Sequence, residues 1–376
     1  MDPFTHLGNA KLIFGNGEIT KLADLLKPYQ SVQIITGKHF IETESWAVIQ
    51  TKLRQANIPF NHNIVSGEPT PQIVDNLTEM ARLHGVDIVV AIGGGSVLDA
   101  GKAIAAMLCH QGSVLDYLEG VGTKTPDAKT LPLIAVPTTA GTGSEATKNA
   151  VIGQRGENPF KKSLRHDAFV PHLAIIDPQL AVGTPRLVTL ACSMDAFCQL
   201  LESLVSTKAT PLTHALALQG ISLFAQGSPL FSDTLYGTPA ELELRGKLAL
   251  AAYLSGLSLA NGGLGTVHGI AGPLGAVCSI PHGAACGILL APVFRRLLAK
   301  SSIKQFTLAR QTLFGEAIDD MEAINLFEQW AKPLGKLSDY GLSELDIDAV
   351  IAHADNKNSP VSLDENEMKQ LLLELL

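Results

Sequence analysis

The sequence predicts two domains: an α/β domain with a doubly wound parallel sheet over residues 1–184, then an all-α domain over residues 185–376. The chain has 376 residues, more than one compact core usually holds. In the first half, apolar strand-like runs alternate with helix-like segments, which is the pattern of a doubly wound sheet. After Pro185 the strand signals stop, and leucine- and alanine-rich helical patterns continue to Leu376. Hydrophobic residues make up 46% of the chain and charged residues 17%, which favours a well-buried fold.

The predicted elements of the first domain follow one another in regular order. The strands are short apolar runs over residues 11–14, 32–36, 61–65, 87–92 and 131–136. The helices between them cover residues 19–26, 45–56 and 72–84, and a fourth begins at Ser96. Ligands of such sheets bind beyond the carboxyl ends of the strands. Gly37, the glycines from Gly93 onwards and the segment 138–144 all lie at such ends.

The strongest candidate binding loop is the turn between the fourth strand and its helix. The strand is apolar without alternation, as a strand covered on both faces must be. Gly93, Gly94 and Gly95 then let the backbone approach a bulky group. We expect Ser96 to cap the helix, whose free N–H groups attract an anion. This predicts a cradle for the pyrophosphate of a dinucleotide; the alternative is a tight turn without a ligand, because Leu98 breaks the usual G-x-G-x-x-G pattern.

Charge and composition exclude several classes of protein. A formal charge of −8 offers no basic surface for nucleic acid. The most apolar runs, residues 248–260 and 283–294, are interrupted by Ser, Gly or Pro and predict buried core helices, not membrane spans. The N-terminal MDPFTHLGNA has no secretory pattern, and five cysteines without framework spacing suit a reducing compartment. We therefore expect a cytoplasmic protein.

A second candidate site lies in the helical domain. Asp195, Gln199 and Glu202 stand at i, i+4 and i+7, on one face of a predicted helix. Downstream, His268 and His282 lie in a glycine-rich region with few charges. One carboxylate and two imidazoles form a three-ligand set for a catalytic metal, with a coordination place left for substrate.

Folding of the chain must bring these histidines together, and two alternatives compete with the metal site. We expect the break at Gly272–Pro273 to let the chain fold back, so that both imidazoles converge. One alternative is that each histidine is an ordinary core residue. The other is a thiolate site built around His282 from three cysteines; these are Cys198, Cys278 and Cys286. Pro281 interrupts the helical register between Cys278 and His282, which disfavours that site.

Taken together, these motifs resemble the iron-containing (group III) alcohol dehydrogenase family over nearly the whole chain. The resemblance is carried by KLIFGNG near residue 11, GGGSVLDAGKA, PTTAGTGSEAT, the PHG around His282 and NSPVS near residue 360. It implies an architecture shared with dehydroquinate synthase: a dinucleotide-binding α/β domain and a helical domain that binds metal and substrate. It also implies a homodimer.

The resemblance further implies roles for single residues. Gly94, Gly95 and Ser96 would hold the pyrophosphate of NAD or NADP, with Asp99 nearby. Other cofactor contacts would come from Thr138, Thr139, Thr142 and Lys161. The catalytic divalent metal, Fe²⁺ or Zn²⁺, would be bound by Asp195, His268 and His282, with Gln199 as a further candidate ligand. The metal would act as a Lewis acid on the alcohol or carbonyl.

Three positions depart from the family pattern. Most members have a histidine where this chain has Gln199, and many have another histidine where it has Gly272. NAD-preferring members often have an aspartate, which binds the ribose 2′-hydroxyl, where this chain has Gly37. Gly37 beside Lys38 could tolerate a 2′-phosphate, which makes NADP a candidate.

The predicted function is a metal-dependent NAD(P) oxidoreductase that interconverts a small alcohol, polyol or sugar-derived alcohol and its aldehyde or ketone. The alternative is a catalytically silent or metal-independent member that binds nucleotide. A lyase resembling dehydroquinate synthase is disfavoured, because its site is rich in Lys and Arg whereas residues 262–292 contain neither. We expect no nucleic-acid or membrane partner.

Overall fold

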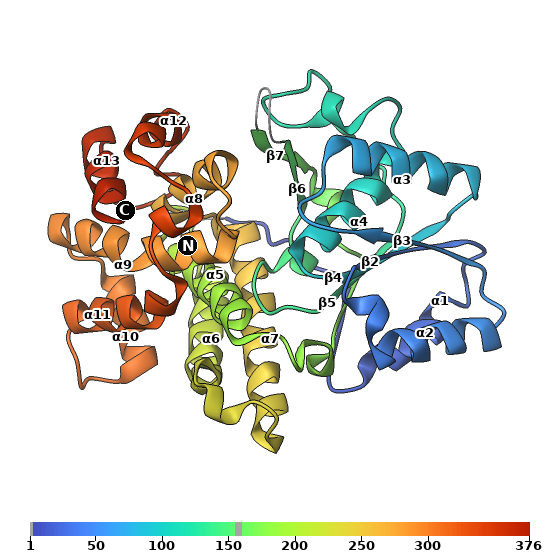
Figure 1. Ribbon diagram of the computed structural model, residues 1–376, viewed down its shortest axis with the longest axis horizontal. Helices are drawn as coiled ribbons and strands as arrows, with labels where there is room; N and C mark the ends of the chain where they lie inside the picture. The colour runs from blue at the N-terminus through green and yellow to red at the C-terminus, as the bar shows by residue number, and fades with distance from the viewer. Residues whose placement is uncertain (1–2, 155–159) are drawn as a thin grey trace. The chain divides into compact units, whose positions relative to one another are not determined.

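The computed structural model describes residues 3–154 and 160–376, and its internal contacts divide the chain into two units (Figure 1). The α/β unit comprises Leu7–Thr139 and Ser144–Val182. The helical unit comprises Gly183–Leu376, the segment Ala140–Gly143 and the N-terminal segment up to His6. The main division therefore falls at Val182, beside the predicted boundary at residue 184, and the short segment 140–143 groups with the helical unit.

The α/β unit is built on a six-stranded sheet in which every pairing is parallel. The strand order is β1-β8-β5-β4-β2-β3. These strands are β1 (Lys11–Phe14), β2 (Val32–Gly37), β3 (Phe60–Val65), β4 (Ile88–Gly93), β5 (Leu133–Pro137) and β8 (Leu173–Ile176). The crossover helices are α1 (Leu22–Leu26), α2 (Glu44–Gln55), α3 (Pro71–Leu83) and α4 (Gly95–Met107). The predicted doubly wound fold is confirmed.

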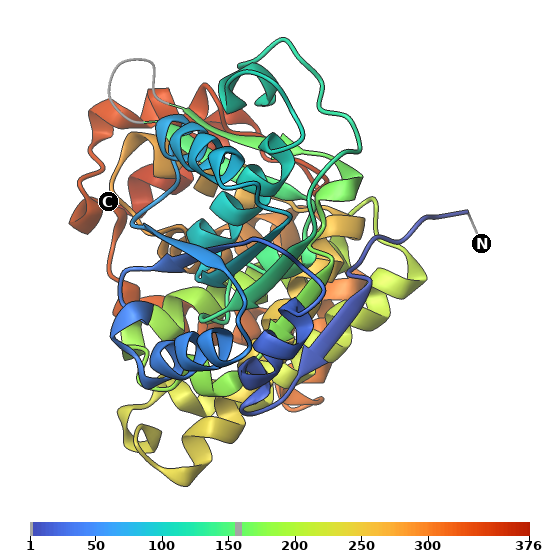
Figure 2. The same ribbon diagram turned by 90° about the vertical axis from the view of Figure 1, so that its right-hand side faces the viewer.

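Each face of the sheet carries its own hydrophobic core, which explains why the central strand is apolar throughout. Side chains of β4 point alternately to the two faces. Val89 and Ala91 belong to the core with α3 and α4. Val90 and Ile92 belong to the core with α1 and α2, and Figure 2 shows this unit from a second direction.

Three strands were not predicted from the sequence. β6 (Asn149–Gln154) and β7 (Phe160–Arg165) form a separate antiparallel pair, and β8 lies between β1 and β5 in the sheet. β7 reads FKKSLR, a polar sequence without the apolar run of a buried strand. The predicted helix 19–26 is also shorter than expected, because its first turn, Glu18–Lys21, is a 3-10 helix.

The helical unit is organised around α5, which packs against α6, α7 and α9. Its helices are α5 (Arg186–Val205), α6 (Pro211–Gly227), α7 (Pro239–Gly262), α8 (Thr266–Val277), α9 (His282–Lys300), α10 (Lys304–Phe314), α11 (Asp320–Ala331), α12 (Ile347–Ile351) and α13 (Glu365–Glu374). By length and composition α5 and α9 could each cross a membrane, and the bent pair α7–α8 also passes that test. However, 83% of the apolar window of α5 and 67% of that of α9 are buried inside the protein, as expected for core helices.

The helix that carries His268 ends later than predicted. Pro273 lies inside α8, which continues to Val277. The break between helices instead lies between Cys278, which ends α8, and Pro281, which caps α9. A proline removes one backbone donor and kinks a helix without always ending it, so the expected break at Gly272–Pro273 was wrong. The consequence is that His282 begins a new helix.

Candidate functional site

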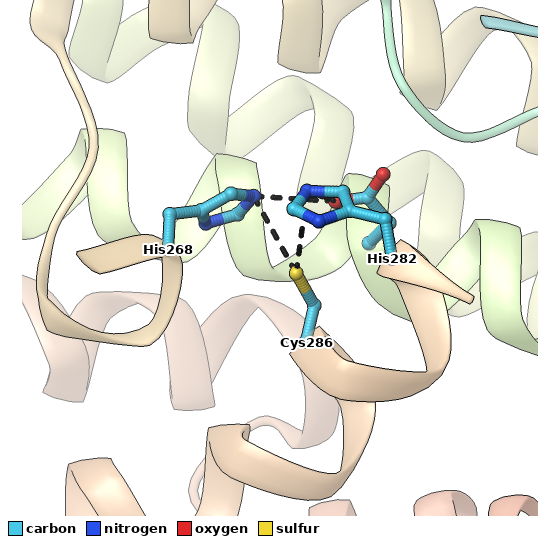
Figure 3. Close-up of side chains that lie close together, drawn as sticks. His268, His282 and Cys286 are labelled. Carbon is cyan, nitrogen blue, oxygen red and sulfur yellow. Dashed lines mark hydrogen bonds and ion pairs between the residues drawn. The ribbon is translucent and has the colours of Figure 1, made fainter. Parts of the chain in front are cut away.

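The predicted carboxylate and imidazoles come together inside the helical unit. Asp195 lies in the middle of α5, His268 in the first turn of α8 and His282 at the start of α9. Asp195 Oδ1 lies 3.2 Å from His268 Nε2 and 3.8 Å from His282 Nε2. Figure 3 shows both imidazoles directed toward the same space. Their ring centroids are 5.4 Å apart. Three helices therefore converge on one cluster of polar side chains.

A fourth donor, the sulfur of Cys286, lies in the same cluster. Cys286 is one helical turn after His282, and it is fully buried. Its Sγ lies 3.6 Å from His268 Nε2 and 3.7 Å from His282 Nε2 (Figure 3). One ligand atom from each of Asp195, His268, His282 and Cys286 lies within 4.8 Å of the others. The cysteine combination weighed from the sequence was different, and the i+4 spacing from His282 was the signal for Cys286.

Gln199 supports Asp195 through a hydrogen bond. Its side-chain nitrogen donates to Asp195 Oδ1 at 2.9 Å, and its oxygen accepts from Ser255 Oγ at 2.6 Å. Both ends of the amide are thus engaged with protein groups. The arrangement orients the carboxylate, and the amide oxygen points to Ser255.

Glu202, one turn further along α5, holds His268. Its Oε2 accepts from His268 Nδ1 at 2.6 Å, and its Oε1 accepts from the Val267 backbone N–H at 2.6 Å. Because a carboxylate only accepts, Nδ1 donates to Glu202, and Nε2 is the nitrogen that faces Asp195 and Cys286, where a metal ion would replace the proton that Nε2 donates to Asp195. The i+7 spacing from Asp195 had placed Glu202 on this helix face, although no role was assigned to it.

The charges of the cluster suit a cation. Burial by itself raises the pKa of Asp195, but His282 and the hydrogen bond from His268 lower it below its usual value. Burial raises the pKa of the Cys286 thiol, so the sulfur keeps its proton unless a cation displaces it. Carboxylate, imidazole and thiolate are the ligands that transition-metal ions such as Zn²⁺ take in proteins. A carboxylate behind a ligating histidine is the usual outer-shell support. The residues therefore fit a divalent metal ion.

Glu202→Gln tests this support. The amide keeps the shape of the side chain but removes the charge that fixes the imidazole and raises its basicity. We expect metal affinity to fall about 10–100-fold, measured by competition with a chelator. Glu243→Gln, on the exposed side of α7, is the matched control and should leave affinity unchanged. Equal affinities for the two variants would contradict the assigned role of Glu202.

The loop predicted to hold a phosphate lies between the end of β4 and the start of α4, with one difference from expectation. Gly94, not Ser96, caps α4, and no side-chain cap bond is made at this position. A Cβ on Gly93 would lie 2.6 Å from the Val97 side chain, which explains the need for glycine there. The first turn of a 13-residue helix thus presents backbone N–H groups without a side-chain acceptor, as an anion site requires.

The other predicted cofactor residues have varied surroundings. Gly37 ends β2, and Lys38 follows it on the surface. Thr138 continues the β5 pairing, donating its backbone N–H to the Gly93 carbonyl. Thr139 has its hydroxyl 3.4 Å from where a Cβ of Gly94 would be. Thr142 belongs to the segment grouped with the helical unit.

Two charged residues assigned to the cofactor already have protein partners. Asp99 accepts from Ser144 Oγ at 2.6 Å and from the Val151 backbone at 3.1 Å. Lys161 forms an ion pair with Glu68. Asp99 therefore fixes the loop after β5, and Lys161 would have to leave Glu68 to meet a nucleotide.

Comparison with known proteins connects this geometry to a family. Residues 9–178 match the sequence model described as "Iron-containing alcohol dehydrogenase", and residues 189–376 match "Fe-containing alcohol dehydrogenase family, C-terminal". The chain belongs to the iron-containing alcohol dehydrogenase family. This confirms the predicted resemblance, and it places the chain among oxidoreductases that act on alcohols.

The names of curated relatives specify several different alcohols as substrates. The 1,3-propanediol dehydrogenase of Klebsiella pneumoniae is 33% identical over 86% of this chain and 82% of its own. Long-chain-alcohol dehydrogenase 1 of Geobacillus thermodenitrificans is 33% identical over 77% of this chain and 70% of its own. Choline dehydrogenase of Bacillus subtilis is 32% identical over 72% of this chain and 71% of its own. This chain is thus similar to enzymes whose names specify different substrates.

Solved structures of iron-containing alcohol dehydrogenases and their relatives share the architecture. A 1,3-propanediol oxidoreductase superposes with a TM-score of 0.88 and 26% identity, covering 100% of both chains. Sulfoacetaldehyde reductase from Bifidobacterium kashiwanohense, solved in complex with NAD⁺, has a TM-score of 0.86 and 26% identity, covering 100% of this chain and 99% of its own. The predicted pairing of an α/β domain with a helical domain is therefore confirmed.

Proposed function

We propose that this protein is a metal-dependent NAD(P) oxidoreductase that interconverts a small alcohol, polyol or sugar-derived alcohol and its aldehyde or ketone. The observation that carries the proposal is the convergence of Asp195, His268 and His282 from three helices onto one buried space. A core histidine needs one satisfied hydrogen-bond partner, whereas here two imidazoles and a carboxylate face one another. Family membership supports the same chemistry.

The residues of the helical unit would hold and tune the metal. When bound, a divalent ion supplies Lewis acidity, which polarises a carbonyl or lowers the pKa of an alcohol. Asp195 contributes negative charge and is oriented by Gln199. His268 offers Nε2 because Glu202 fixes its other nitrogen. His282, the first residue of α9, is less buried than Asp195 and His268 and is the third ligand of this set.

The α/β unit would supply the hydride carrier. A nicotinamide nucleotide, when bound, donates or accepts hydride directly. The N-terminus of α4, with Gly94, Gly95 and Ser96, would hold its pyrophosphate through backbone N–H groups. The NAD⁺ complex of the sulfoacetaldehyde reductase supports NAD as a cofactor, while Gly37 and Lys38 keep NADP as the competing choice.

Gly37→Asp tests how the nucleotide is selected. A Cβ at this position would lie 3.6 Å from Val97, an ordinary contact, so a side chain can be accommodated. An aspartate would repel a 2′-phosphate and accept from a 2′-hydroxyl. We expect NADPH affinity to fall at least about tenfold relative to NADH, or about 1.4 kcal/mol, measured by nucleotide fluorescence. Gln55→Asp, exposed on α2, adds the same charge elsewhere and should leave the ratio unchanged; an unchanged ratio in Gly37→Asp would remove Gly37 from the selection site.

We propose a substrate without strong negative charge. Residues 262–292, which include both metal-binding histidines, contain no Lys or Arg that could neutralise a phosphate or sulfonate. The relatives named for propanediol and long-chain alcohols support neutral alcohols. Localisation in the cytoplasm and assembly as a homodimer stay predictions from the sequence and the resemblance.

Metal analysis of the chelator-free protein, paired with titration of NADH and NADPH, tests the proposed function. Stoichiometric zinc or iron together with nucleotide binding, followed by turnover on a panel of diols and primary alcohols, is the expected result. Nucleotide binding without metal, persisting after metal is added back, would overturn it in favour of a metal-independent or silent member.

A further inference from the structure

The sulfur of Cys286 has the position of a metal ligand. It lies one turn after His282 on α9, and it faces Nε2 of both histidines at 3.6 and 3.7 Å. Donor atoms that are each about 2.0–2.3 Å from one tetrahedral ion stand roughly 3.3–3.6 Å apart. The Asp195–His268 separation of 3.2 Å and the Asp195–His282 separation of 3.8 Å bracket the same range. These four separations are therefore close to those of one coordination set, and all four ligand atoms lie within 4.8 Å of one another.

The other cysteines near this region have different environments. Cys198 Sγ donates to the Cys286 carbonyl at 3.3 Å, and Cys278 Sγ donates to the Leu274 carbonyl at 3.3 Å. Neither belongs to the cluster whose ligand atoms lie within 4.8 Å of one another. Cys286 is thus singled out by the direction of its side chain, which Figure 3 shows pointing up between the two rings.

A site with three protein ligands would leave this sulfur unexplained. Gln199 engages Asp195 through its nitrogen and Ser255 through its oxygen, so its amide is committed to supporting the carboxylate. The thiol, by contrast, is fully buried with two imidazole nitrogens in front of it. A buried thiol beside metal-binding imidazoles either donates a weak hydrogen bond to them or loses its proton and binds the same ion.

We propose that the thiolate of Cys286 is the fourth protein ligand of the divalent ion, beside Asp195, His268 and His282. The inference rests on the proposed function, because it needs a metal at this site. On binding, the S–H bond breaks, the sulfur keeps the electron pair for the bond to the metal, and the proton passes to solvent. A set of two imidazoles, one carboxylate and one thiolate favours zinc-like, borderline-soft ions over harder ones. Zinc sites can expand to five ligands, which leaves a place for a substrate oxygen.

Cobalt substitution tests the proposal with a readout independent of turnover. The full-length protein is stripped with a chelator and reloaded with Co²⁺, and its spectrum is recorded. A thiolate bound to Co²⁺ produces a charge-transfer band in the near ultraviolet, whereas nitrogen and oxygen ligands do not. We expect the band in the wild type and in Cys278→Ser, whose thiol lies outside the cluster. We expect Cys286→Ser to lose the band, still bind Co²⁺, and bind it at least about tenfold more weakly.

The outcomes separate this inference from the proposed function. Stoichiometric Co²⁺ in the wild type without the band would overturn the thiolate ligand, leaving a hydrogen-bonded thiol, while the proposed metal site would stand. A band that persists in Cys286→Ser would assign the sulfur elsewhere and also overturn the proposal. Absence of Co²⁺ binding in the folded wild type would overturn the metal site itself, and the thiolate ligand with it. Because a wild-type spectrum without the band overturns the thiolate ligand without any variant, the proposal can be refuted even if a variant misfolds.

Discussion

Asp195→Ala should abolish metal binding and reduce turnover about 10³-fold or more, while nucleotide binding is unchanged. The aspartate supplies negative charge to the cluster, and its oxygen lies 3.2 Å from His268 and 3.8 Å from His282. Its loss removes one charged donor and leaves only the imidazoles and Cys286 around the ion. A metal ion stabilises transition-state charge by several kcal/mol, and about 4 kcal/mol corresponds to a 10³-fold rate. The proposed nucleotide site belongs to the α/β unit, so NAD(P)H titration should match that of the wild type.

Two further variants make the Asp195 result specific. Asp195→Asn keeps the size of the side chain and removes only the charge, so it should lose metal as well. Asp348→Ala removes an exposed carboxylate that pairs with Lys369 in the same unit, and it should keep metal and activity. Undiminished turnover in Asp195→Ala would end the metal mechanism, whereas loss of nucleotide binding would show a global fold defect.

Lys102→Met should lower the free energy of unfolding by about 3–5 kcal/mol. The side chain is 1% exposed, and its ammonium group donates to Ser144 O at 2.9 Å, Thr147 Oγ1 at 3.0 Å and Asn149 O. It also pairs with Asp99 Oδ1 at 3.1 Å. Burial lowers the pKa of Lys102, and Asp99 counters this shift. Methionine fills the volume but leaves buried acceptors and a carboxylate without their cation, which is the costly way to break a buried pair.

The control for Lys102→Met is a lysine of the same unit whose ion pair is accessible to water. Lys148 pairs with Asp167 at 2.7 Å, and that carboxylate is 62% exposed. Lys148→Met should cost less than about 1 kcal/mol. Chemical unfolding followed by far-ultraviolet circular dichroism measures both. If the two lysine variants were equally stable, the bonds that Lys102 makes to the loop after β5 would contribute nothing to the fold.

Much of the fold followed from local patterns. The apolar runs of β2, β4 and β5 and the glycines at the end of β4 identify a doubly wound sheet, because strands buried on both faces lose their polar alternation. Local patterns did not predict the strand β8 or its place between β1 and β5. Pairing between strands far apart in the chain is set by how the crossovers pack, and a single sequence does not reveal that packing.

The sequence by itself determined which residues of the candidate site are capable of the chemistry. Asp195 and Glu202 share a helix face by periodicity, and His268 and His282 followed from their type, their uncharged surroundings and the family resemblance. Only the tertiary structure decided what each one faces. Helical spacing puts Cys286 one turn from His282. Whether its sulfur contacts the imidazoles or the hydrophobic core depends on how α9 is rotated against α5 and α8. Packing of the whole helical unit sets that rotation.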